Sequence, residues 1–241
     1  MEPETLFPVP PDPRIIEIDR RLLAHYGQPP PRDVWNPLDQ FIYSLLSSRT
    51  KTEQSHQVMR DLRARFGTWE NLRDAAVAEI EQTLQIITFP EVKALWLKKD
   101  LMEITARCGE LSLEFLAKYR TNKIRSWLEQ FEGVGAKTSA AVVNFSTLRR
   151  RALCVDSHHL RVTQRLGLTP RADAAITEER LMRKIPADWD AIKLDDHHSL
   201  IKKHGQELCT FAEPHCRRCP LLDMCPEGQK QTKANPSDIA S

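Results

Sequence analysis

The sequence of 241 residues contains no apolar run of 18 or more residues, which excludes a transmembrane helix of ordinary length. Its start, MEPETLFPVPPDPR, lacks the basic-then-apolar order of a secretion signal and the Arg-rich, acid-poor character of a transit peptide. We therefore expect a cytoplasmic protein that has no membrane partner. In that reducing compartment its six cysteines are better explained as metal ligands, catalytic thiols or core residues than as a disulfide framework.

The sequence also has little net charge and no convincing strand. A formal charge of +2 does not argue for a nucleic acid partner by itself, because a non-specific binder needs its basic residues on one face. Apolar residues recur at three- and four-residue steps, as in Ile15, Ile18 and Leu22, which is the period of an amphipathic helix. We therefore predict an all-α protein. Its ends, residues 1–13 and 227–241, are expected to be flexible because they are proline-rich or polar.

One segment, residues 124–145, predicts two helices joined by a glycine turn and reads IRSWLEQFEGVGAKTSAAVVNF. Gly133 and Gly135, on either side of Val134, let the backbone approach another surface closely. The second helix begins with unpaired N–H groups and with the positive end of its dipole. These features favour a phosphate-binding helix-hairpin-helix. The alternative is a turn that only joins two packed helices.

Two residues near this turn suggest a reaction. Lys137 falls in the first turn of the second helix, where the dipole disfavours the ammonium and so favours the neutral, nucleophilic amine. Asp156, in ALCVDSHHLRV, could accept a proton from an amine or stabilise a developing positive charge. The same local sequence fits an ordinary N-cap of the helix that follows.

Four cysteines lie close together near the end of the sequence, in the pattern C-x6-C-x2-C-x5-C. So tight a cluster predicts a metal site, and the spacing suits tetrahedral zinc and an iron–sulfur cluster equally well. Cys108 and Cys154 lie in apolar surroundings and are expected in the core. The four candidate ligands are Cys209, Cys216, Cys219 and Cys225.

The combination of FEGVGAKTSAAVVNF, CVDSHHLRV and DDHHSLIKKHGQELC with the four cysteines resembles the endonuclease III family of helix-hairpin-helix DNA glycosylases. The similarity extends over about residues 15–225. It implies a two-lobed fold: a six-helix barrel over 31–149 that ends in the hairpin, and a second lobe from 14–30 and 150–226. It also implies that duplex DNA binds between the lobes and that the cysteines hold a [4Fe-4S] cluster.

Carried over by position, the resemblance gives Lys137 the role of the nucleophile and Asp156 that of the essential aspartate. It implies a monomeric, nucleoid-associated base-excision-repair enzyme that acts on double-stranded DNA containing a damaged base or an abasic site. The expected activities are glycosylase on oxidised pyrimidines and AP lyase, with β-elimination through a lysine Schiff base.

The sequence departs from the family pattern at three positions. Arg49, in LLSSRTKT, stands where the family has a glutamine that fills the gap left by the flipped nucleotide; Arg49 could do the same or contact only phosphate. Phe89, in ITFPEVKA, stands where an apolar side chain wedges into the base stack, although it could be a core residue beside Pro90. Glu132 replaces a proline before the hairpin and should weaken DNA affinity.

Two other functions remain open at this point. The departures at Arg49, Phe89 and Glu132 would suit a paralogue that removes mismatched uracil or thymine. A non-catalytic module that binds DNA structure would retain the hairpin and the cysteines for binding alone. His158, directly after Asp156 and Ser157, is expected to face the DNA, whereas His197 and His198 are expected to make buried structural hydrogen bonds.

Overall fold

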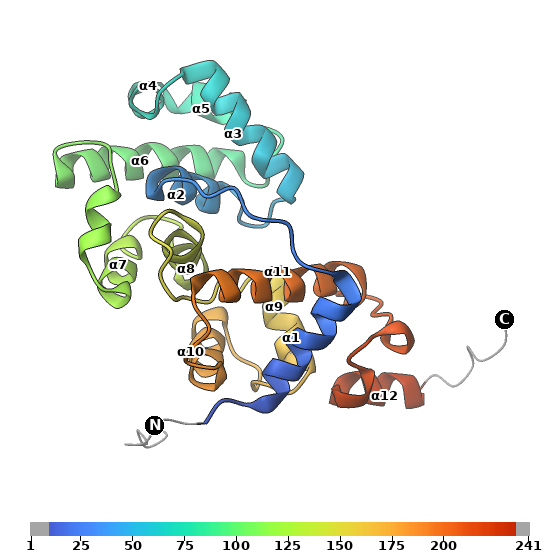
Figure 1. The fold of residues 1–241 in the computed structure, drawn as a ribbon. Helices are drawn as coiled ribbons and strands as arrows, with labels where there is room; N and C mark the ends of the chain where they lie inside the picture. The colour runs from blue at the N-terminus through green and yellow to red at the C-terminus, as the bar shows by residue number, and fades with distance from the viewer. Residues whose placement is uncertain (1–9, 235–241) are drawn as a thin grey trace. The chain divides into compact units, whose positions relative to one another are not determined.

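The computed structural model describes residues 10–234, and this range contains helices and connecting segments only (Figure 1). No strand occurs within it, and the one extended pairing is an isolated bridge between Trp35 and Ser146. The predicted all-α class is therefore confirmed. None of the helices in the described range is both long enough and apolar enough to cross a membrane.

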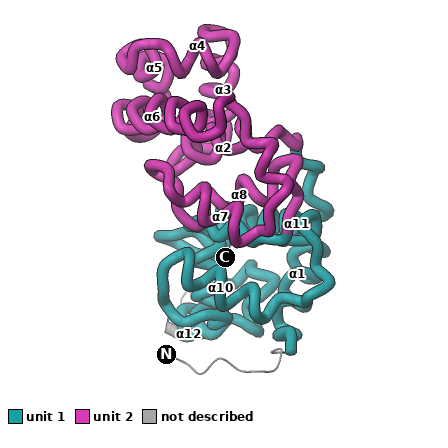
Figure 2. Tube along the Cα trace, turned by 90° about the vertical axis from the view of Figure 1, so that its left-hand side faces the viewer, with its two compact units in different colours: residues 1–32, 151–241 teal, residues 33–150 magenta. Residues whose placement is uncertain are grey.

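The chain divides into two compact units, coloured separately in Figure 2. One, here called the hairpin unit, comprises residues 33–150. The other, the cysteine unit, comprises residues 10–32 and 151–234 of the described range. Because residues 14–30 belong to the same unit as the C-terminal part, this unit is discontinuous in sequence.

The hairpin unit is built around α2, whose polar and apolar residues explain its start and its burial. Asn36 caps the helix by accepting a hydrogen bond from the Asp39 N–H at 2.8 Å, and Pro37 occupies the first helical position. Phe41 and Leu45 are buried, and α2 packs on α8 and α6. The elements of this unit are α2 (Pro37–Leu46), α3 (Thr52–Phe66), α4 (Trp69–Asp74), α5 (Val77–Thr83), α6 (Pro90–Cys108), η1 (Glu114–Lys118), α7 (Thr121–Leu128) and α8 (Ala136–Phe145).

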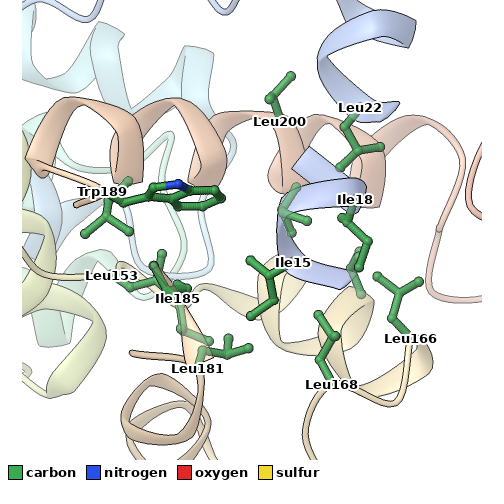
Figure 3. Packing of buried hydrophobic residues seen from close by; sticks show 14 of the residues in the cluster. Ile15, Ile18, Leu22, Leu153, Leu166, Leu168, Leu181, Ile185, Trp189 and Leu200 are labelled. Atoms are coloured by element: carbon green, nitrogen blue, oxygen red, sulfur yellow. The ribbon is translucent and has the colours of Figure 1, made fainter. Parts of the chain in front are cut away.

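The cysteine unit has its own apolar core (Figure 3). Ile15, Ile18 and Leu22 lie on one face of α1, as their spacing predicted, and pack with Leu200 of α11 and Leu166. Full burial of each such side chain contributes about 1.5–3 kcal/mol. The elements of this unit are α1 (Pro13–Tyr26), α9 (Ser157–Arg165), α10 (Ala174–Lys184), α11 (Ala191–Glu207), η2 (Cys216–Arg218), η3 (Leu222–Met224) and α12 (Pro226–Ala234).

Parts of the two end segments that were expected to be flexible have regular structure within the described residues. Residues 226–234 form α12, although they carry almost no apolar side chains. Hydrogen bonds to the preceding loop hold this polar helix: Gly228 N donates to Cys225 Sγ, and Gln229 Nε2 donates to the Asp223 carbonyl. At the other end, Asp12 caps α1. The rest of both predictions, on residues 1–9 and 235–241, lies outside the described residues.

Candidate active site

The hairpin between α7 and α8 contains two glycines, and the backbone conformation and the surroundings of the two differ. Gly133 has a φ of +71°, and a Cβ there would lie 2.4 Å from Trp96 Cε3 and 2.9 Å from Leu45 Cδ1. Gly135 has extended backbone, and nothing lies within 4 Å of the position of its missing Cβ. Val134, only 7% exposed, anchors the turn between them. The side chain of Val134 is thus used for packing, which leaves its backbone as the part that could meet DNA.

Lys137 lies in the first turn of α8 and is partly buried. Its Nζ is 3.4 Å from the Oγ of Ser47, in the turn that follows α2. Lys93 of α6 reaches the same turn and is near enough for its pKa to be influenced by the Lys137 charge. The structure therefore places a candidate nucleophile beside a second, buried lysine.

Sequence reasoning missed Lys93, which is 2% exposed. Burial, followed by the charge of Lys137, lowers the pKa of Lys93 to about 8. A signal was present in the sequence: Lys93 precedes Leu97 and Leu101 at four-residue steps, so it falls on the core-facing side of α6. A lysine in such a stripe requires buried acceptors.

The structure brings Arg49 and Phe89 together, as the sequence could not show. Both side chains are exposed, and the Arg49 guanidinium carbon lies 6.0 Å from the centre of the Phe89 ring. Phe89 is 48% exposed, so the alternative of a core residue is excluded. Both residues have a left-handed backbone, with φ of 54° and 56°. Such strain in residues other than glycine occurs preferentially at functional sites.

Glu132, the residue before the hairpin glycine Gly133, is bonded to two residues of α6. The Glu132 N–H donates to Oδ1 of buried Asp100 at 3.2 Å, a bond that a proline at this position could not make. Its carboxylate pairs with Lys99 at 2.6 Å. Burial raises the pKa of Asp100 to about 7, against the lowering effect of the Glu132 hydrogen bond. The anion expected to repel phosphate is therefore partly neutralised by Lys99.

Asp156 begins α9 in the cysteine unit, where its Oδ1 accepts a hydrogen bond from the His159 N–H at 2.8 Å. The N-cap interpretation is therefore correct, and it is compatible with a chemical role. Burial opposes ionisation of the carboxyl, but His198 and the His159 N–H outweigh it and lower the pKa of Asp156 to about 2. The group is a carboxylate at neutral pH, as a proton acceptor or a stabiliser of positive charge must be.

The neighbouring histidines have different surroundings. His158 is partly buried, its Nδ1 lies 3.1 Å from Arg161 Nη2, and its ring packs against Gly205. Its contact with DNA stays a prediction. His197 and His198 are buried and hydrogen bonded, to Asp19 and to the Cys154 carbonyl respectively, as expected.

The four cysteines line one pocket whose cavity volume is about 20 Å³. Three of the sulfurs accept hydrogen bonds: Cys209 from Arg165 at 3.3 Å, Cys219 from the Leu221 N–H at 3.4 Å, and Cys225 from the Gly228 N–H at 3.3 Å. The rest of the lining is largely apolar, and burial raises the pKa of the Cys219 thiol to about 11. Among the described residues no set of three or more Cys, His, Asp or Glu side chains is arranged to bind a single metal ion.

Residues 42–187 match the family model described as the HhH-GPD superfamily of base excision DNA repair proteins. The chain belongs to this superfamily, and within it to the endonuclease III family. Similar proteins and similar solved structures support its membership of the endonuclease III family. Endonuclease III of Bacillus subtilis is 31% identical over 82% of this chain and 84% of its own length. A candidate DNA glycosylase of Arabidopsis thaliana is 31% identical over 77% of the chain, which spans 65% of that relative.

Solved structures agree with this placement in the endonuclease III family. A trapped covalent intermediate of endonuclease III and DNA has a TM-score of 0.75 and 25% identity, with 91% of this chain and 98% of that chain covered. A thermostable thymine-DNA glycosylase has a TM-score of 0.70 at 18% identity and shows the shared fold alone. The helix-hairpin-helix fold of this endonuclease III family member is thus established.

Proposed function

We propose that this chain is a DNA glycosylase with AP lyase activity that removes oxidised pyrimidines from duplex DNA. The observation that carries the proposal is the amine of Lys137, held in the first turn of α8 directly after a hairpin that is exposed at Gly133 and Gly135. The family membership supports the same chemistry, because the relatives include endonuclease III proteins.

DNA binding in this proposal begins at the hairpin. The first N–H groups of α8 have no partner within the helix, and together with the helix dipole they attract a phosphate. Gly135 leaves open space in which the backbone of the DNA can approach. Arg49 and Phe89 are proposed to occupy the duplex after the damaged nucleotide is flipped, Arg49 in the gap and Phe89 between base pairs.

The chemistry follows from Lys137 and Asp156. The amine of Lys137 attacks C1′ of the deoxyribose through its lone pair, the bond between C1′ and the base breaks, and the base leaves with the electron pair. Asp156, anionic at neutral pH, stabilises the positive charge that develops on the sugar and accepts the proton that the amine loses. The sugar ring then opens to a Schiff base on Lys137, loss of a C2′ proton expels the 3′ phosphate, and hydrolysis releases the amine.

We also propose that Cys209, Cys216, Cys219 and Cys225 hold a [4Fe-4S] cluster. The donor set fits: four sulfurs line one largely apolar pocket, and N–H groups point at three of them, as suits thiolates. When bound, the cluster supplies a cross-link that fixes the loop carrying Arg217 and Arg218. No step of the base removal requires it.

The proposal is tested with a panel of defined duplexes, each with one oxidised pyrimidine, 8-oxoguanine, a G·U or G·T mismatch, or an abasic site. The wild-type protein is expected to release the oxidised pyrimidine and to nick the strand, and Lys137→Ala is expected to do neither. Asp156→Asn should be strongly impaired although asparagine can still cap α9. Release from the mismatches alone would favour a paralogue function, and tight binding without release or nicking would favour a non-catalytic module.

A further inference from the structure

Lys93 has three strong hydrogen bonds to one short turn. Its Nζ donates to the carbonyls of Leu46 at 2.8 Å and Ser48 at 2.7 Å, and to Thr50 Oγ1 at 3.0 Å. An ammonium has three protons to donate, so this buried group is fully satisfied by residues 46–50. All three bonds of this buried ammonium therefore go to one turn, two of them to its backbone carbonyls.

The turn of residues 46–50 carries Arg49, which the proposed function uses, and Ser47, which contacts the proposed nucleophile. Ser47 Oγ contacts Lys137 Nζ, and Arg49 projects toward the Phe89 ring. The acceptors of Lys93 lie immediately before and after Arg49, which has the strained left-handed backbone. A strained conformation persists only when its surroundings determine it. The bonds from Lys93 supply part of that determination.

The segment that carries Phe89 is fixed to the same turn. Thr88 Oγ1 donates to the Arg49 carbonyl at 2.7 Å, and the Thr88 N–H donates to Thr50 Oγ1 at 3.3 Å. Thr50 Oγ1 therefore serves both Lys93 and Thr88. A change at Lys93 is transmitted to Arg49 directly and to Phe89 through these two bonds.

We infer that Lys93 is a positioning residue, whose ammonium holds the turn of residues 46–50 so that Ser47 meets Lys137 and Arg49 is presented beside Phe89. This inference rests on the proposed function and deepens it, because it makes the opposite-base preference and the rate of base release depend on a buried residue that does not touch DNA. The low pKa of Lys93 agrees with a buried cation near Lys137.

Lys93→Met is the direct test, because methionine has a similar length and removes all three donors. Lys98→Met is a matched control: Lys98 also lies in α6 and donates to carbonyls of another loop, those of Arg73 at 3.0 Å and Ala75. Each variant loses the hydrogen bonds that a lysine of α6 donates to the backbone carbonyls of a loop. Of these two lysines, Lys93 alone donates hydrogen bonds to the turn that carries Arg49.

Single-turnover base release is measured with each of the four bases opposite the lesion, with AP lyase activity and urea unfolding alongside. We expect Lys93→Met to slow base release by about 10- to 100-fold, the scale of a misplacement near 1 Å, and to flatten the opposite-base ranking. Lys98→Met should keep the wild-type ranking and rate. A folded Lys93→Met with wild-type rate and ranking, or an equal loss in Lys98→Met, would overturn the inference.

If Lys93→Met does not fold, Lys93→Arg is measured instead. Arginine keeps the charge and the donors but in a larger planar fork, so we expect a measurable shift in the opposite-base ranking with restored stability. A wild-type ranking in that variant would refute the positioning role. An inactive wild-type protein would remove the proposed function, and the inference with it, whereas an active wild type with an unaffected Lys93 variant would remove the inference alone.

Discussion

Substitution of Gly133 by alanine should destabilise the protein, because this glycine is required both by conformation and by packing. The backbone φ of +71° is a left-handed conformation, which costs a residue with a Cβ about 1–2 kcal/mol. The added Cβ would lie 2.4 Å from Trp96 Cε3 and 2.9 Å from Leu45 Cδ1, and overpacking of this kind costs about 1–3 kcal/mol more. Gly133→Ala is therefore expected to lower the free energy of unfolding by about 2–5 kcal/mol.

Gly135→Ala is the matched control within the same hairpin. Its backbone is extended and nothing lies within 4 Å of the new Cβ, so its free energy of unfolding should change by less than about 1 kcal/mol. Its DNA affinity should nevertheless fall, because the Cβ would occupy the space left for the phosphate backbone. Urea unfolding monitored by tryptophan fluorescence measures the first quantity, and binding to a duplex with an abasic-site analogue measures the second.

The packing argument is wrong if Gly133→Ala unfolds within about 0.5 kcal/mol of the wild type, since that is the size of a neutral surface change. Equal destabilisation by both alanines would also contradict it, because only one of the two positions is crowded. Undiminished DNA affinity in Gly135→Ala would remove the hairpin as the phosphate contact and leave the stability argument intact.

Three further predictions concern His159, Asp100 and Cys219. His159 is fully buried and neither ring nitrogen has a hydrogen-bond partner among the described residues, so His159→Leu should raise the free energy of unfolding by about 2 kcal/mol; a loss of stability in urea would contradict this. Burial raises the pKa of Asp100 from 3.8 to about 7, because the folded protein disfavours the charged carboxylate. The folded state is therefore unpenalised by Asp100 below pH 3.8, where the group is neutral, and it loses stability as the pH rises toward 7. The stability of the wild type relative to Asp100→Asn should therefore fall by a few kcal/mol between pH 4 and pH 7 and then level off, and a flat difference across an unfolding series would refute the burial argument. Cys219→Ser removes one proposed cluster ligand, so the purified variant should lose the visible sulfur-to-iron absorbance and the iron content expected of the wild type; full retention of both would exclude Cys219 from the ligand set.

Much of the fold could be predicted from local patterns. The face of α1 formed by Ile15, Ile18 and Leu22 followed from their spacing, and the start of α2 followed from Asn36 and Pro37. The hairpin followed from its two glycines. These features are decided by residues within one or two turns of each other, which is why a sequence pattern predicts them. In contrast, α12 is held by hydrogen bonds to the cysteine loop and has no apolar pattern of its own.

The parts of the site that the sequence could not supply are those made by contacts between distant residues. Arg49 and Phe89 were separate candidates in the sequence, but their mutual contact and the hydrogen bonds that Thr88 and Lys93 make to the same turn join residues far apart in the chain. Lys93 is 47 residues from the Leu46 carbonyl that it binds. The bond between Asp100 and the Glu132 N–H likewise spans 32 residues, and it uses a backbone donor that a proline at this position would lack.

The central claim is that Lys137 forms a covalent Schiff base with the sugar of the DNA. It is tested most directly by borohydride reduction of the protein mixed with abasic-site duplex, followed by digestion and mass spectrometry of the cross-linked peptide. We predict one adduct at Lys137, absent from Lys137→Ala and retained in Lys98→Met. An adduct that maps to another residue, or that forms undiminished in Lys137→Ala, would contradict the account.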